Sequence, residues 1–219
     1  MTDKSSQQPT ERDYLPGMGK HFLLPIYDVV HVVFGVGRVH EEMIALAGLR
    51  DGHRVLDVGC GTGNLLRATG KRHRNVELVG MDPDLKMLAR AERKMRRNGL
   101  KAQLDRGFAQ ELQFPDASFD RVFSSLMLHH LDTQSKDEML AEVRRVLRPD
   151  GLLVLADATL HEHDHHGRRK HGPPKEVLKD NYGDAVSKRI AAAGFTVEPT
   201  RTRKLRVGGE IGIEVARPQ

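Results

Sequence analysis

A short apolar run that breaks into alternating glycines constrains the fold of this chain more than any other feature. Residues 55–58 read as a buried strand, because the run is β-branched and aliphatic. The glycines that follow it are Gly59, Gly61 and Gly63. A helical pattern then begins at Asn64. Strand, glycine turn and helix together bring backbone close to a ligand and aim free helical N–H groups at it.

A second strand with an acidic end strengthens this interpretation. Residues 76–82 form another apolar run, and its last residue, Asp82, follows the last glycine of the turn by about twenty positions. A carboxylate at this position is suited to a ribose, because it can accept hydrogen bonds from both hydroxyls of the diol. The pattern therefore predicts a nucleoside ligand, and NAD shares this layout with other nucleosides.

Three motifs, in order, resemble class I methyltransferases that use S-adenosylmethionine (SAM). They are D-V-G-C-G-T-G at 57–63, F-P-D-A-S-F-D at 114–120 and S-x-x-x-H-H-L at 125–131. The resemblance covers residues 22–217, and the chain is most similar to the ubiquinone/menaquinone-biosynthesis type. It implies a Rossmann-like α/β fold, with a seven-stranded mostly parallel sheet, an antiparallel last strand and helices on both faces.

The same resemblance implies an enzyme that transfers a methyl group from SAM to a small-molecule acceptor by in-line displacement. The residues that it places on the cofactor are Tyr27, Asp57, Gly59, Cys60, Gly61, Gly63, Asp82, Pro83, Phe108, Ala109, Ser124 and His129. Asp57 would orient the aminoacyl end of SAM, the glycines would make room for its methionine part, and Asp82 would hold the ribose. Phe108 departs from the family, which usually has there an acid that accepts from the adenine amino group.

The candidate catalytic residues are His129 and Asp157. Both follow strands of the predicted sheet, and ligands of open parallel sheets lie beyond the carboxyl ends of the strands. A histidine near neutral pKa can remove a proton from an acceptor. The alternatives are that His129 only packs against the cofactor and that Asp157 caps a helix or loop.

The predicted organisation is one methyltransferase domain with an N-terminal appendage. Residues 1–20 are expected to be a flexible tail, residues 21–52 two helices that form a lid or pad the sheet, and residues 53–219 the domain. A histidine-rich stretch interrupts the domain at 158–174. Its candidate metal ligands are His161, His163, His165 and His166, but the run is contiguous and hydrophilic, so we predict a surface loop and no metal.

Composition excludes several other classes. The single cysteine rules out an internal disulfide framework, and no apolar run is long enough to span a bilayer, so we expect a cytoplasmic protein. The net charge of +5 invites a nucleic-acid substrate. However, the basic residues fall in helical stretches, where solvated faces are common, and nucleic acid is therefore not expected. The patterns imply no particular oligomeric state.

Two rival functions share the predicted fold. One is a regulatory protein that binds SAM or a nucleotide without catalysis, which Phe108 makes conceivable. The other is an NAD-dependent oxidoreductase. S-adenosylhomocysteine and NAD discriminate between the enzyme and the second rival. A methyltransferase would be protected from unfolding by S-adenosylhomocysteine, and an NAD-dependent oxidoreductase by NAD.

Overall fold

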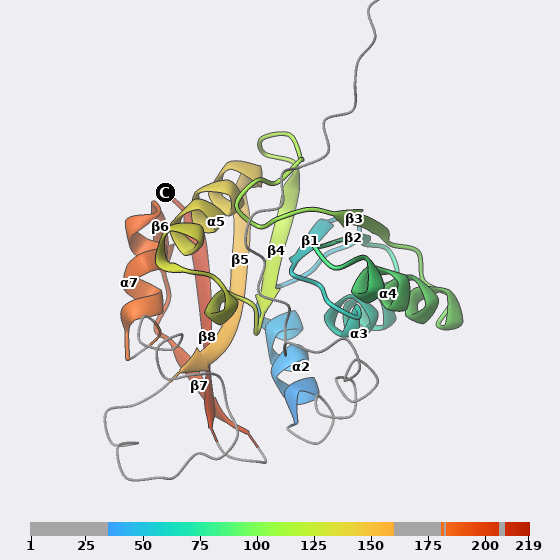
Figure 1. Ribbon diagram of the computed structural model, residues 1–219, viewed down its shortest axis with the longest axis horizontal. Coiled ribbons are helices and arrows are strands. Elements are labelled where there is room, and N and C mark those ends of the chain that lie inside the picture. The colour runs from blue at the N-terminus through green and yellow to red at the C-terminus, as the bar shows by residue number, and fades with distance from the viewer. Residues whose placement is uncertain (1–34, 160–180, 182, 206–208) are drawn as a thin grey trace, which may run out of the picture.

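One twisted sheet with helices on both faces forms the body of the protein (Figure 1). The computed structural model describes residues 35–159, 181, 183–205 and 209–219. The helices are α2 (Val36–Leu46), α3 (Asn64–Arg72), α4 (Leu85–Arg97), the short 3-10 helix η2 (Leu128–His130), α5 (Thr133–Val146) and α7 (Ala185–Ala192). The strands are β1 (Arg54–Val58), β2 (Glu77–Asp82), β3 (Gln103–Arg106), β4 (Phe119–Ser125), β5 (Leu147–Thr159), β6 (Phe195–Val197), β7 (Arg201–Lys204) and β8 (Glu210–Pro218).

The order of the strands is that of a doubly wound sheet with one reversed strand. Along the sheet the order is β3-β2-β1-β4-β5-β8-β6, with parallel pairing from β3 to β5. β8 is antiparallel to both β5 and β6. The predicted fold class and its antiparallel last strand are therefore confirmed. The carboxyl ends of β1, β2, β4 and β5 meet at one edge of the sheet, which we call the carboxyl edge.

The sheet has eight strands rather than the predicted seven, because one edge strand is split. β6 pairs with the end of β8 at 216–218, and β7 pairs with its beginning at 210–213. Pro199 lies between the two short strands, and a proline has no N–H to donate to the ladder. The split explains the additional strand without any change in topology.

Two separate apolar cores cover the two faces of the sheet. On one face α2, α3 and α4 pack against the sheet through side chains such as Met43, Leu66 and Leu88. On the other face η2, α5 and α7 pack through residues such as Leu140 and Ile190. Strands that are buried on both faces need continuous apolar runs, which is how β1 and β5 read in the sequence.

An apolar pattern with helical spacing extends over 174–193. Within the described part of this stretch, α7 begins at Ala185, after a turn at 183–184. Gly183 precedes it with a φ of 57°, a left-handed conformation that interrupts a right-handed helix. The predicted tail at 1–20, the part of the predicted lid at 21–34 and nearly all of the loop at 158–174 lie outside the described residues. None of the described helices has the length and apolar content needed to cross a membrane.

Arg145 ties the long connection between β3 and β4 to helix α5. Its guanidinium donates to the carbonyl oxygens of Leu112 and Phe114, both at 2.8 Å, and to Asp116 Oδ1 at 2.6 Å. It also forms a bidentate pair with Glu142, which in turn accepts from the N–H of Leu112. The hydrogen bonds to Glu142 and Asp116 raise the pKa of Arg145. A planar guanidinium satisfies all of these acceptors at once, which a lysine cannot do.

Replacing Arg145 by methionine should therefore destabilise the fold. Arg145→Met leaves two carbonyls and a carboxylate without their donor, at a cost of about 2 kcal/mol, or roughly 4–8 °C in Tm for a chain of this size. Thermal unfolding measures the change. Arg96→Met is the matched control, because Arg96 is exposed on α4 without a side-chain partner among the described residues. The Tm of this variant should stay within about 2 °C of the wild-type value. Equal Tm values for the two variants would contradict this account.

Candidate functional site

The glycine turn after β1 is held against the end of β2. The N–H groups of Gly59 and Cys60 both donate to the carbonyl oxygen of Met81, at 2.8 and 2.9 Å. Gly59, Gly61 and Gly63 all have positive φ, between 52° and 73°, and Gly63 is the N-cap of α3. This conformation is costly for any residue with a Cβ, which explains why the three positions are glycines.

Gly59 and Gly61 differ in the space around them. A Cβ on Gly59 would lie 2.4 Å from Met127 Cγ, whereas a Cβ on Gly61 would meet nothing within 4 Å. Gly59 therefore lets Met127, which lies between β4 and η2, pack against the turn. Gly61 instead borders open space, where a ligand has access to the backbone.

Asp82 at the end of β2 is hydrogen-bonded to the turn. Its Oδ2 accepts from the N–H of Gly61 at 2.9 Å, and its Oδ1 accepts from the N–H of Asp84 at 2.9 Å. Burial raises the pKa of Asp82 to about 6, although these two N–H groups oppose the rise. Asp82 is thus a buried carboxylate placed at the carboxyl edge, and each oxygen can still accept a further hydrogen bond.

Asp57, one strand away, is buried without a partner. It is only 2% exposed, and its carboxylate forms no hydrogen bond or ion pair with any of the described residues. Burial, and then the nearby charge of Asp82, raise the pKa of Asp57 well above its ordinary value. A buried carboxylate without a counter-charge is costly, so this position favours a cationic ligand group.

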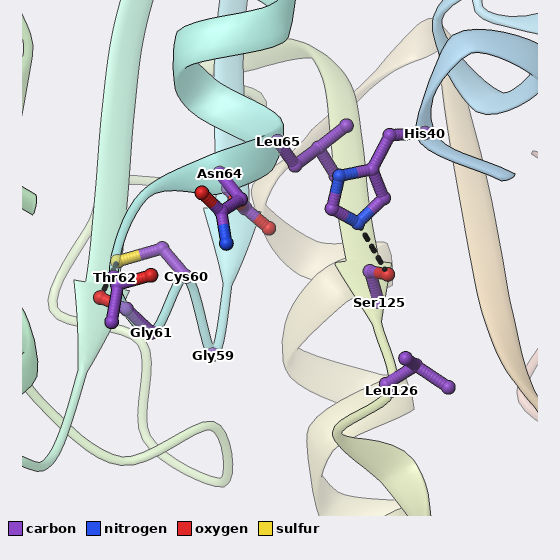
Figure 2. A pocket seen from close by; sticks show the side chains of 10 residues that line it. His40, Gly59, Cys60, Gly61, Thr62, Asn64, Leu65, Ser125 and Leu126 are labelled. Carbon is purple, nitrogen blue, oxygen red and sulfur yellow. Dashed lines mark hydrogen bonds between the residues drawn. The ribbon is translucent and has the colours of Figure 1, made fainter. Parts of the chain in front are cut away.

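A cleft at the carboxyl edge is lined by Asp57 and the glycine turn (Figure 2). The residues that line it are His40, Asp57, Gly59, Cys60, Gly61, Thr62, Asn64, Leu65, Ser125 and Leu126. Figure 2 shows the His40 ring reaching from α2 to the end of β4, where Nε2 lies 3.0 Å from Ser125 Oγ. His40 was not among the predicted site residues. A histidine beside the apolar positions Val39 and Met43 of an amphipathic helix was the signal that could have found it.

The end of β4 carries two local departures from ordinary packing. Leu126 has a φ of 56°, an uncommon conformation for a residue with a Cβ. Ser124, a predicted cofactor residue, is buried, and its Oγ has no hydrogen-bond partner within the described part of the chain. Ser124 is in register with Val58, directly before the glycine turn. An unsatisfied buried hydroxyl and a strained residue at one strand end are typical of binding sites.

His129 and Asp157, the candidate catalytic residues, are in direct contact. His129 Nδ1 lies 2.6 Å from Asp157 Oδ1, and the backbone N–H of His129 donates to Asp157 Oδ2 at 3.0 Å. Burial lowers the pKa of His129, but the charge and hydrogen bond of Asp157 outweigh it, so the net pKa is raised. Burial and the neighbouring His129 lower the pKa of His130 to about 4, so that ring is neutral at pH 7.

Asp157 also borders a second, smaller cavity on the other side of β5. Its lining includes Leu155, Val186 and Glu214, so it lies between β5, β8 and α7. Glu214 is buried and accepts hydrogen bonds from the hydroxyls of Ser187 and Thr200. The His129–Asp157 pair therefore has a cavity beside it that is separate from the one at Asp57.

The remaining predicted residues occupy the carboxyl edge or lie outside the described residues. Cys60 is buried in the turn, and burial raises the pKa of its thiol well above the ordinary value. Pro83 follows Asp82, while Phe108 and Ala109 lie on the connection that follows Gly107, whose N–H donates to the carbonyl of Asp82. Tyr27 and the candidate metal ligands His161, His163, His165 and His166 fall outside the described residues. Within the described residues no group of three metal-ligating side chains occurs.

Comparison with known proteins agrees with this geometry. The family described as a methyltransferase domain matches residues 55–151. The ubiquinone/menaquinone biosynthesis C-methyltransferase UbiE of Cupriavidus pinatubonensis is 28% identical over 89% of this chain and 82% of its own length. An uncharacterised protein of Haemophilus influenzae is 33% identical over 70% of this chain, but this chain spans only 58% of that relative.

Solved structures show the same fold. A SAM-dependent methyltransferase from Aquifex aeolicus superposes with a TM-score of 0.69, at 24% identity over 89% of this chain and 96% of that one. A Haemonchus contortus phosphoethanolamine N-methyltransferase, solved with S-adenosylhomocysteine, superposes with a TM-score of 0.71, at 16% identity over 92% of this chain and 58% of that one.

A methyltransferase domain thus matches residues 55–151, and the fold and the glycine turn are those of class I SAM-dependent methyltransferases. Within that class it is similar to the enzymes of ubiquinone and menaquinone biosynthesis, as its motifs predicted.

The two glycines of the turn provide a matched test of its geometry. Gly59→Ala combines a left-handed φ with overlap on Met127, so we expect a loss of at least about 2 kcal/mol in unfolding free energy. Gly61→Ala has only the conformational cost, about 1 kcal/mol. Denaturant unfolding measures both. A Gly59→Ala protein as stable as Gly61→Ala would contradict the packing of the turn against Met127.

Proposed function

We propose that this protein transfers the methyl group of SAM to a small-molecule acceptor by in-line displacement. The observation that carries the proposal is Asp57, a buried carboxylate without a partner among the described residues, which lines the cleft beside the glycine turn. SAM supplies an electrophilic methyl group on a sulfonium sulfur, which leaves as a neutral thioether. The chain's own residues bind, orient and deprotonate.

Asp57 would bind the α-ammonium group at the amino-acid end of the cofactor. The carboxylate is buried and has no cationic partner among the described residues, and burial, then the charge of Asp82, raise its pKa. A ligand ammonium would supply that charge and lower the pKa again. The open space beside Gly61 leaves backbone accessible at the same end of the cleft.

Asp82 would hold the ribose, and the connection at 107–109 would border the adenine. The Asp82 carboxylate is already oriented by the N–H groups of Gly61 and Asp84, which suits it to accept from a diol. The N–H of Gly107 donates to the carbonyl of Asp82, so Phe108 and Ala109 begin next to it. A phenyl ring can stack on adenine, and a backbone N–H can donate to a ring nitrogen.

His129 would act as the general base for an acceptor that must lose a proton. Because Nδ1 faces Asp157, the ring is favoured in the tautomer that carries the proton on Nδ1. Nε2 is then the nitrogen that takes the proton from the acceptor as the new bond to the methyl carbon forms. Asp157 stabilises the resulting imidazolium, as its effect on the pKa of His129 indicates.

A small acceptor is supported by the named relatives. The relatives of the ubiquinone/menaquinone type are C-methyltransferases of quinone biosynthesis, and the Haemonchus contortus enzyme was solved with phosphomonomethylethanolamine. Similarity to the first group favours an apolar, quinone-like acceptor for this chain.

Ligand-dependent unfolding tests the cofactor assignment against the NAD-dependent rival. At one hundred times its Kd, S-adenosylhomocysteine should stabilise the protein by about 2.7 kcal/mol, or roughly 5–10 °C in Tm, while NAD leaves Tm unchanged. Asp82→Ala should lose the response, because the ribose loses its acceptor. A shift with NAD alone would overturn the proposal, and an intact response in Asp82→Ala would refute the ribose assignment.

Asp57→Asn should change stability and binding in opposite directions. The folded pKa of Asp57 is raised, so the ionised group destabilises the fold as pH rises above its unfolded pKa near 4. The variant should therefore have a higher Tm than the wild type without ligand, by more at pH 8 than at pH 5. Its affinity for S-adenosylhomocysteine should fall at least about tenfold, or 1.4 kcal/mol, by calorimetry.

The matched control for this variant is Asp51→Asn, which removes an exposed carboxylate at the opposite end of β1 and should leave affinity unchanged within about twofold. Unaltered Tm and affinity in Asp57→Asn would show that the carboxylate does not face a ligand cation.

The pH dependence of turnover tests the His129–Asp157 pair. Activity should fall with decreasing pH as His129 becomes protonated, with a midpoint above the ordinary value of about 6.5, because Asp157 raises its pKa. Asp157→Asn should move this midpoint to lower pH, and His129→Gln should lower kcat by about a hundredfold while S-adenosylhomocysteine still binds. A midpoint that does not move in Asp157→Asn would exclude His129 as the titrating base.

A further inference from the structure

The positive charge of the chain is concentrated in one segment whose lysine and arginine side chains the proposed function does not use. Residues 64–101, which include α3 and α4, contain eleven lysine and arginine residues and four aspartate and glutamate residues. The other 181 residues contain 24 basic and 26 acidic residues. All of the net positive charge therefore comes from these two helices and the strand between them.

On α4 the cations form a single stripe. Lys86, Arg90, Arg93 and Arg97 are spaced i, i+4, i+7 and i+11, which places them along one side of the helix over about 16 Å. The opposite side of α4 is buried in the core through Met87, Ala91 and similar residues. We call these four residues the α4 stripe.

No counter-charge within the described residues compensates the α4 stripe. Three of its members are exposed or nearly so, and none has a side-chain hydrogen bond or ion pair with a described residue. Like charges at i, i+4 weaken a helix, so the arrangement is unfavourable by itself. An anionic surface would remove that repulsion.

Helix α3 extends the basic surface on the same face of the sheet. Arg67 and Lys71 lie at i and i+4 on α3, Arg74 follows the end of the helix, and none of the three has a side-chain partner within the described residues. α3 and α4 belong to the same core and contact each other, because Gly63 at the start of α3 packs against Ala91 of α4. Figure 1 shows the two helices side by side at the same end of the sheet.

We propose that the basic surface of α3 and α4 binds the protein to an anionic lipid bilayer. Two features favour a bilayer over a nucleic acid. Residues 64–101 contain no Phe, Tyr or Trp, the side chains on which unpaired bases stack. Leu85, next to Lys86, is 59% exposed and is the one large apolar side chain that is exposed among the described residues. Clustered cations beside an exposed apolar side chain suit a charged interface.

Such binding would bring the enzyme to an acceptor that is dissolved in the membrane. Binding to the bilayer does not depend on the proposed function. Only the benefit of this binding for catalysis rests on it, because the proposed function favours an apolar acceptor. Lys86 and Leu85 begin α4 just after Asp82 and Pro83, so the basic surface starts at the carboxyl edge. The bilayer would therefore lie beside the opening of the cleft.

Co-sedimentation of the full chain with lipid vesicles tests the proposal. The vesicles consist of phosphatidylcholine alone or of an equal mixture of phosphatidylcholine and phosphatidylglycerol, each at about 0.1 M and about 1 M salt. We expect binding only to the anionic vesicles and only at the lower salt. Replacing the four residues of the α4 stripe by glutamine should weaken that binding at least about tenfold.

The matched control replaces four exposed cations elsewhere, Arg50, Lys188, Lys204 and Arg217, by glutamine. It has the same net charge as the stripe variant and should bind within about threefold of the wild type. Both variants should keep the wild-type Tm within a few degrees and the wild-type affinity for S-adenosylhomocysteine, which separates this proposal from the proposed function.

Three results would overturn the inference. They are equal binding to neutral and anionic vesicles, equal loss in the stripe and control variants, and no vesicle binding with salt-dependent binding to RNA or duplex DNA instead. If the protein binds neither vesicles nor nucleic acid, the inference is also wrong, and the α4 stripe is a solvated face.

Discussion

Burial of two carboxylates beside one glycine turn is the constraint on which the rest of the site depends. Asp57 lies next to the end of β1 and Asp82 ends the adjacent parallel strand β2, so the sheet brings them to the same edge, and the charge of Asp82 adds to burial in raising the pKa of Asp57. Asp82 is compensated by two backbone N–H groups, whereas Asp57 has no partner in the described residues. The fold therefore retains an unfavourable charge that a ligand bearing a cation would relieve.

The surrounding elements keep this edge open and rigid. Gly59 allows Met127 to pack against the turn, His40 joins α2 to Ser125, and Arg145 holds the connection that begins at Gly107 and ends at β4. On the opposite side of β4, Asp157 fixes His129 next to a second cavity. The two halves of the proposed reaction, cofactor binding and acceptor deprotonation, thus fall on neighbouring strand ends of one sheet.

Local patterns predicted the parts of this arrangement that depend on short stretches of sequence. The glycine turn and the acidic end of β2 followed from spacing and periodicity, whereas the reversed last strand was implied by the family resemblance, and the fold class was confirmed. His40 and Ser125 were missed because they are 85 positions apart, and only the packing of α2 against β4 joins them. The lone carboxylate of Asp57 was equally hidden, since a missing partner is a property of the folded chain. The split of the edge strand had a local signal in Pro199, but the periodicity of the apolar residues does not take a proline into account.

Proton release on ligand binding tests the central claim most directly. If a ligand ammonium pairs with Asp57 and a ribose hydrogen-bonds to Asp82, the pKa of both carboxyls falls when S-adenosylhomocysteine binds. Calorimetric titrations between about pH 5 and pH 7, in two buffers of different ionisation enthalpy, should then show net proton release, which is reduced in Asp57→Asn. Binding without proton exchange, or with the same release in that variant, would contradict the account.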